Sequence, residues 1–213
     1  MKKHPATICV RAVITILFAF APAFSSDFFP MGDGYTWTYE GYMKNTPKKK
    51  LVVTASIIKR EKIAGQEYYY YSAPSVDVRF LVRLDDNFGY MKVLKYPFPV
   101  LKFVTLDVYL TPEIQFIKLP YRVGDAWEQK INAEANLTPF KMNQEIKVKF
   151  TVMDSEKLIF KDKEYEVFHV RMVRDEGNNK TRTEDNWFAD GIGFVRGETP
   201  EYFIELKDFI KEK

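Results

Sequence analysis

Thiol and imidazole side chains are scarce in this 213-residue chain, which has one cysteine, Cys9, and two histidines, His4 and His169. Cys9 and His4 lie in an N-terminal leader, so the remainder has no thiol and one imidazole. That inventory excludes disulfides, thiol nucleophiles, cysteine-ligated metals and multi-histidine metal sites from the remainder. We therefore expect no metal and no other cofactor.

Residues 1–25 have the three parts of a secretory signal: the basic segment MKKHPATICVR, the 13-residue apolar run AVITILFAFAPAF, and small residues for cleavage after Ala23 or Ser25. The run is shorter than the roughly 20 residues that span a bilayer, although a retained N-terminal anchor is the alternative. Cys9 precedes the run, which argues against lipid attachment there. We expect a periplasmic or secreted protein with no transmembrane segment after cleavage.

The positive charge of the whole chain comes from this leader. Without Lys2, Lys3 and Arg11, the 32 basic residues become 29, equal to the 29 acidic ones. A neutral chain has no strong electrostatic attraction for phosphate backbones or anionic lipid, so we expect no nucleic-acid partner. The basic triplet Lys48–Lys50 is interpreted as a solvated hairpin tip.

Helical periodicity is also missing beyond two turns, and two-residue alternation dominates. IKVKFTV at 146–152 and YTWTY at 35–39 place large apolar residues on one face and Lys or Thr on the other. This pattern predicts a mainly β fold. The terminal segment 203–213 is predicted to form a final strand, with a helix as the alternative.

A phrase recurs at an interval of 90 residues: FPMGDGYTW ends at Trp37, and LPYRVGDAW ends at Trp127. Similar strand and turn segments follow each copy. We predict two β-meander repeats, 26–118 and 119–213, in one compact unit; chance similarity between common β patterns is the alternative. The proline, glycine and aspartate favour a turn that starts a strand, with equivalent buried tryptophans, over a ligand site.

These phrases, together with WFADGIGFVRG and the closing IELKDF, resemble a group of secreted bacterial β-rich proteins of unknown function. The resemblance implies an antiparallel, strongly curved sheet or half-barrel, similar to that of periplasmic lipoprotein carriers. It brings no catalytic residues. The chain differs from those carriers in lacking a helix-rich lid.

The sequence gives little support for an enzyme. Carboxylate pairs occur by chance among 29 acidic residues, and no Gly-x-Ser-x-Gly motif is present. His169 alternates with apolar neighbours and is predicted to be a solvent-side or edge histidine rather than a general base. A carboxylate-based hydrolase is the least favoured function.

A binding module is the preferred interpretation, because a concave sheet face lined by aromatic residues can hold an apolar or amphipathic ligand such as a lipid or glycolipid. The candidate ligand-binding residues are Trp37, Tyr39, Phe103, Phe150 and Phe168. Ordinary core packing is the competing interpretation of these side chains. The alternative function is a structural or assembly role, with sheet edges recruiting an envelope protein partner.

Overall fold

The computed structural model describes residues 28–76, 78–85, 87–97, 105–137, 140–175 and 181–211. The leader and Phe103 lie outside these residues. The described residues form β-strands and one short 3-10 helix, η1 (Pro74–Val76). The strands are β1 (Thr36–Met43), β2 (Thr46–Ile63), β3 (Gln66–Ala73), β4 (Val78–Leu84), β5 (Phe88–Pro97), β6 (Thr105–Lys118), β7 (Ala126–Leu137), β8 (Phe140–Phe160), β9 (Lys163–Asp175), β10 (Thr181–Ala189), β11 (Gly193–Glu198) and β12 (Tyr202–Ile210).

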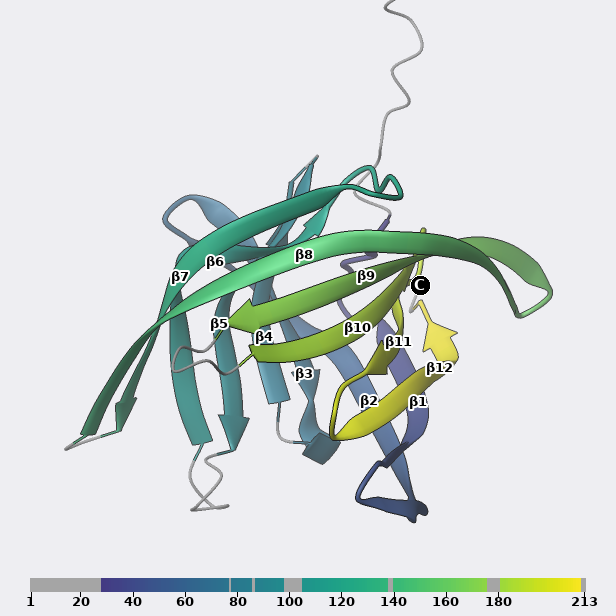
Figure 1. The fold of residues 1–213 in the computed structure, drawn as a ribbon, viewed down its shortest axis with the longest axis horizontal. Coiled ribbons are helices and arrows are strands. Elements are labelled where there is room, and N and C mark those ends of the chain that lie inside the picture. The colour runs from purple at the N-terminus through teal and green to yellow at the C-terminus, as the bar shows by residue number, and fades with distance from the viewer. Residues whose placement is uncertain are drawn as a thin grey trace, which may run out of the picture.

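Each strand pairs antiparallel with the next, and the sheet is strongly curved, as the family resemblance implies (Figure 1). The half-barrel form of the prediction is corrected, because β1 pairs with β12 from Thr36–Ile210 to Met43–Tyr202 and closes the sheet into a barrel. The closing strand is the terminal segment predicted as β. Closure satisfies the backbone groups that the two outermost strands of an open sheet would leave unpaired.

Alternation along the strands positions the core. In β8, Val148, Phe150 and Val152 are buried while Lys147 and Lys149 are exposed. The buried residues form two clusters. One gathers side chains of β6–β10 with Phe28 and Phe29, and the other gathers side chains of β1–β3 with those of β11 and β12.

The recurring phrase has the same backbone geometry in both copies. Gly34 and Gly124 both have positive φ, 82° and 90°, which glycine adopts without steric cost. Each glycine donates its backbone N–H to the carbonyl of a residue two strands later, which lies on β2 for Gly34 and on β8 for Gly124. The N–H of that strand residue donates in return to the carbonyl of the residue that follows the glycine. The bonds are Gly34 N to Ile57 O (3.2 Å), Ile57 N to Tyr35 O (3.1 Å), Gly124 N to Val152 O (2.8 Å) and Val152 N to Asp125 O (2.9 Å).

The predicted repeat boundary, between residues 118 and 119, coincides with the end of β6, so six of the described strands precede it and six follow it. A β-bulge follows Ile57 in the β2–β3 pair and Val152 in the β8–β9 pair. Both phrases therefore act as strand starts with the same local bonding. Division of the chain into two repeats remains a prediction.

Candidate functional site

The predicted ligand-binding residues that the structure describes are packed in the core. Trp37 and Tyr39 are 0% and 2% exposed in one cluster, and Phe150 is 3% exposed in the other. Phe168 is partly buried against the same cluster as Phe150. None of the four lines the two clefts described below. Their role as ligand contacts remains a prediction.

The sheet is split between β11 and β12. These strands pair at only three positions, Arg196–Glu205, Gly197–Ile204 and Glu198–Phe203, and from Leu206 onward β12 pairs with β1 alone among the described residues. The β8–β9 hairpin extends past the last β9–β10 pair, Val167–Ala189. We call residues 155–166 the arm; Figure 1 shows it reaching beyond β10 toward β12.

The tip of the arm is fastened to β12. Lys161 Nζ donates to the Phe209 carbonyl at 3.0 Å and forms an ion pair with Asp208 at 2.5 Å. Lys161 and Asp162 have positive φ, 49° and 62°, as in the tight two-residue turns that suit hairpins. The arm therefore covers the edge of β12 beyond Glu205, where β11 no longer pairs with it.

Between the arm and β11–β12 lies a cleft of about 200 Å³. Its lining contains both apolar and charged side chains. The apolar ones are Leu158, Ile159, Phe160, Val167, Val195 and Leu206, and the charged ones are Glu156, Arg196, Glu205 and Lys207. We call this the arm cleft.

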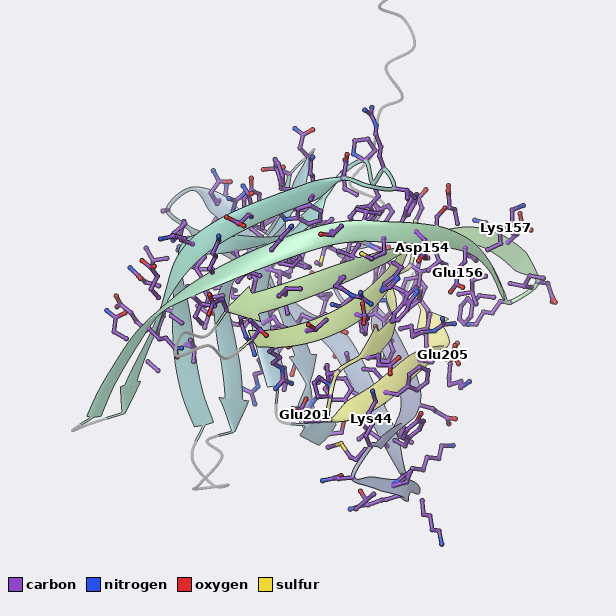
Figure 2. The ribbon with its side chains drawn as sticks, viewed as in Figure 1. Lys44, Asp154, Glu156, Lys157, Glu201 and Glu205 are labelled. Carbon is purple, nitrogen blue, oxygen red and sulfur yellow. The ribbon has the colours of Figure 1, made fainter. Side chains whose placement is uncertain are left out.

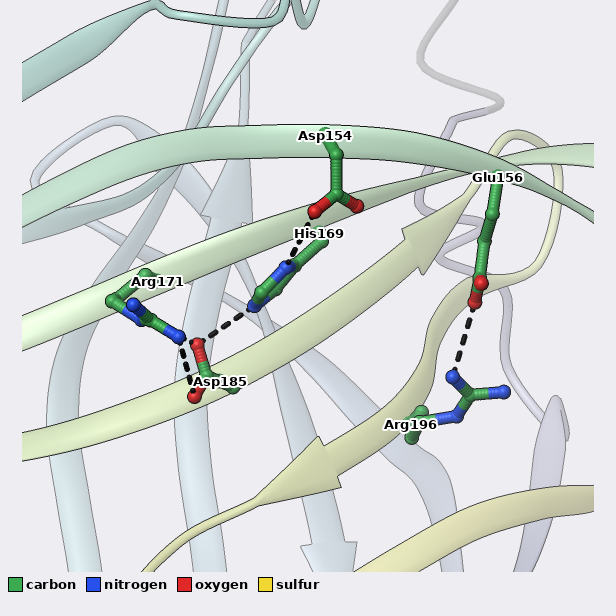
Figure 3. A network of polar contacts seen from close by, with 6 residues as sticks. All are labelled: Asp154, Glu156, His169, Arg171, Asp185 and Arg196. Carbon is green, nitrogen blue, oxygen red and sulfur yellow. Dashed lines mark hydrogen bonds and ion pairs between the residues drawn. The ribbon is translucent and has the colours of Figure 1, made fainter.

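Arg196 links the two sides of the arm cleft. Its Nη1 donates to Glu156 Oε1 on the arm at 3.0 Å (Figure 3). Its Nη2 donates to Glu205 Oε1 on β12 at 3.1 Å, and Figure 2 labels both glutamates. Its guanidinium lies 5.2 Å from the Trp187 ring centre. Arg196 Nε is buried and has no hydrogen-bond partner among the described residues. Such an unpaired buried donor is uncommon in folded proteins.

Beside the cleft, five residues lie directly opposite one another on successive strands: Asp154, His169, Trp187, Arg196 and Glu205. The His169 and Trp187 rings stack at 4.4 Å with an interplanar angle of 8°. This row joins the arm cleft to a polar network on the outer face of β8–β10 (Figure 3).

His169 is the centre of that network. Its Nε2 lies 2.7 Å from Asp185 Oδ1 and its Nδ1 lies 3.3 Å from Asp154 Oδ2. Arg171 donates to both oxygens of Asp185, at 2.8 and 3.3 Å. Burial by itself would raise the pKa of Asp185, but the hydrogen bonds from Arg171 and His169 outweigh it and lower that pKa below its ordinary value.

The prediction of a solvent-side or edge histidine is corrected. His169 does lie on the outer face, as alternation requires, but β9 is paired on both sides and the residue is only 9% exposed. Stacking on Trp187, a residue 18 positions away, accounts for the burial. His169 lines neither cleft, and carboxylates occupy both ring nitrogens, so its geometry fits a structural role.

A second, larger groove of about 530 Å³ lies where β6 and β7 separate. These strands pair only from Val108–Ala135 to Thr111–Asn132. Farther along, side chains replace the ladder: Gln129 Oε1 accepts from Gln115 N at 3.1 Å, and Trp127 Nε1 donates to Gln115 O at 2.8 Å. The groove is lined by Arg83, Tyr90, Pro112, Glu113, Gln115, Gln129 and Lys130.

The polar lining of this groove is held by hydrogen bonds. Arg83 lies over the Tyr90 ring at 3.6 Å and forms an ion pair with Glu113 at 2.7 Å, while the Tyr68 hydroxyl also donates to Glu113. Such a wall suits a polar ligand better than an acyl chain. Sequence reasoning missed both clefts, since they depend on where neighbouring strands separate.

Two further findings concern the described residues only. No group of three or more His, Cys, Asp or Glu side chains there is arranged to hold a metal ion. No helix in this part of the chain is long and apolar enough to cross a membrane.

No protein-family model and no curated protein matches the sequence significantly. Among solved structures, a Bacteroides fragilis protein, whose name describes it as exported with a YmcC-like fold, matches at TM-score 0.50 and 14% identity over 86% of this chain and 99% of that one. A Parabacteroides distasonis protein named as a lipoprotein matches at 0.47 and 14%, over 86% and 98%. Escherichia coli YmcC, also named as a lipoprotein, matches at 0.46 and 10%, over 98% and 99%. At these identities, the likeness to the Bacteroides fragilis structure shows a shared fold and no more.

Proposed function

We propose that this chain is an exported, non-catalytic envelope protein that binds an amphipathic ligand in the arm cleft. Export is supported by the signal-like composition of residues 1–25 and by the name of the Bacteroides fragilis protein that shares the fold. The lipoprotein names of the other two structures agree with an envelope location.

The observation that carries the ligand proposal is the mixed lining of the arm cleft. Leu158, Phe160 and Val195 are among the apolar side chains that would contact a hydrocarbon segment, while Arg196 and Lys207 lie beside them with positive charge. Small-molecule sites usually combine an apolar surface with a few well-placed polar groups. The groove between β6 and β7 has Tyr90 and Pro112 as the apolar side chains of its lining, and no Leu, Ile, Val or Phe.

Size limits the ligand. The arm cleft holds about 200 Å³, below the roughly 300–1,000 Å³ of sites for drug-sized ligands. It therefore takes one short apolar chain, with the polar end at the charged rim. Eight buried methylenes would contribute about 6 kcal/mol before the cost of ordering the ligand is subtracted.

The other predicted functions find less support. Assembly through sheet edges needs an unpaired outer strand, and closure of β1 on β12 removes the two ends of the sheet. A carboxylate-based hydrolase would need free carboxylates beside the ligand, whereas Glu156 and Glu205 in the arm cleft both accept hydrogen bonds from Arg196.

Two aliphatic residues provide a matched test, one inside the arm cleft and one outside it. Leu158 lines the cleft and packs against the apolar cluster, whereas Ile58 on β2 is 54% exposed and lines neither cleft. We expect protein purified gently from its own host to carry an added mass in native mass spectrometry, which solvent extraction identifies as lipid or glycolipid. Leu158→Asp should lose that mass, and Ile58→Asp should keep it, because only the first charge is placed against the hydrocarbon.

Both variants should be checked by circular dichroism, and Leu158→Ala serves as a milder substitution if Leu158→Asp does not fold. An apo mass for the native protein, or a ligand that both Leu158 variants retain fully, would contradict the arm-cleft site. Export is tested separately: N-terminal sequencing of the protein from the periplasm or medium should begin at Phe24 or Ser26. Intact chain in the inner membrane would contradict export.

A further inference from the structure

Basic residues are segregated in one part of a chain that is otherwise balanced in charge. Between Glu40 and Glu61 there is no acidic residue, and the interval contains Lys44, Lys48, Lys49, Lys50, Lys59 and Arg60. The first four lie at the tip of the β1–β2 hairpin, where β1 ends at Met43 and β2 begins at Thr46. Figure 1 shows this hairpin projecting past β12, and Figure 2 labels Lys44 there.

Only part of this charge is neutralised. Lys44 Nζ forms an ion pair with Glu198 at 2.7 Å, and Lys50 Nζ forms one with Glu40 at 2.7 Å. Lys48 and Lys49 are exposed and have no ion-pair partner among the described residues. The outermost part of the hairpin therefore has an excess of positive charge, although the chain without its leader is neutral.

Exposed apolar side chains lie among these lysines. Tyr42 is 39% exposed and stacks on Phe203 of β12, with ring centres 5.6 Å apart. It lies directly opposite Lys50 in the β1–β2 register, on the same face of the sheet. Val52, two residues farther along that face, is 46% exposed. We call Tyr42, Lys48, Lys49, Lys50 and Val52 the hairpin surface.

We propose that the hairpin surface docks on an anionic phospholipid membrane. Lysines near such a surface are attracted by the lipid head groups, and tyrosine is enriched at the membrane–water interface, where its ring is in contact with hydrocarbon and its hydroxyl with water. A soluble polyanion would use the lysines but would gain nothing from Tyr42 and Val52. The combination therefore favours a lipid surface, which goes beyond the ligand proposed for the arm cleft.

Sedimentation with vesicles tests this docking. The purified protein should bind vesicles of mixed phosphatidylglycerol and phosphatidylcholine at low salt, bind phosphatidylcholine alone far more weakly, and dissociate as salt increases. The double variant Lys48→Gln/Lys49→Gln should lose about 25-fold in vesicle affinity, at roughly 5-fold for each lysine. The separate variant Tyr42→Ser should also weaken vesicle binding, but the dependence of that binding on salt should stay the same as in the parent protein.

The matched control is Lys62→Gln/Lys149→Gln, which removes the same charge from exposed positions outside the hairpin surface. It should keep most of the vesicle affinity, and both lysine double variants should melt like the parent protein because those side chains are exposed. Tyr42→Ser loses the stacking on Phe203, so its fold is checked by circular dichroism before its vesicle affinity is compared. Equal losses in the two double variants, or no preference for anionic vesicles, would overturn the proposal. Binding to heparin that Tyr42→Ser does not change, without binding to vesicles, would assign the surface to a polyanion and also overturn it.

Discussion

Trp37 and Trp127 each donate the indole N–H to a backbone carbonyl on the other side of the predicted repeat boundary. Trp37 bonds to Ile192 O and Trp127 to Gln115 O, both at 2.8 Å. Their surroundings differ, however. Trp37 is fully buried against Phe209 and Tyr71, whereas Trp127 is only partly buried and stacks on Phe150. The sequence predicts equivalent anchors, and the structure gives them unequal burial.

Replacing these tryptophans by alanine should therefore have unequal effects. Trp37→Ala should reduce the free energy of unfolding by about 3–5 kcal/mol, the range for truncating a buried large aromatic residue. Trp127→Ala should cost less, because part of its surface is already in contact with water. Urea unfolding at pH 7 measures both. Equal losses would show that exposure is a poor guide to the contribution of Trp127.

Phe150→Asp should prevent folding, because residue 150 is 3% exposed and its apolar surroundings offer no partner for a carboxylate. Val123→Asp, at a position 57% exposed, is the control and should fold normally. Circular dichroism distinguishes the two. A folded Phe150→Asp variant would point instead to a wet wall inside the barrel, as a ligand contact at this position requires.

Acid should weaken the His169 network through Asp185. Since the pKa of Asp185 is lower in the folded state, its stabilising contribution is complete above the unfolded value of about 3.9 and is lost as pH falls through the folded value. Asp185→Asn should therefore destabilise the protein more at pH 7 than at pH 3, as measured by urea unfolding.

Arg171 provides a second check on the same linkage, because its hydrogen bonds help to lower the pKa of Asp185. Arg171→Gln should shift the acid loss of stability to higher pH. The acid loss of stability could instead occur at the same pH in Arg171→Gln as in the parent protein, and persist in Asp185→Asn. That result would show that other carboxylates cause the loss.

Alanine substitutions at Gly193 and Gly191 distinguish the cost of backbone strain from the cost of steric crowding. Both have positive φ, 83° and 74°, but a Cβ at Gly193 would lie 2.8 Å from the Phe29 ring, while one at Gly191 would meet nothing within 4 Å. Gly191→Ala should cost about 1–2 kcal/mol from the left-handed conformation. Gly193→Ala should cost about 1–3 kcal/mol more from overpacking. Thermal melts of the two variants test the difference, and equal melting temperatures would mean that Phe29 moves aside.

The sequence by itself determined the local features of this protein. Alternation at 146–152 set which residues of β8 point inward, and the positive φ needed at Gly34 and Gly124 marked the two strand starts. These features depend on a two-residue period and on steric limits of single residues, so they can be inferred from neighbours in the chain.

Only the tertiary structure decided closure and the clefts. Pairing of Thr36 with Ile210, the early end of the β11–β12 ladder, and the bond from Lys161 to Phe209 all depend on register between distant segments. The same applies to His169, which is buried by stacking on Trp187. Periodicity within a strand contains no information about which strand lies beside it, so closure, the arm cleft and the burial of His169 could not be predicted from the sequence.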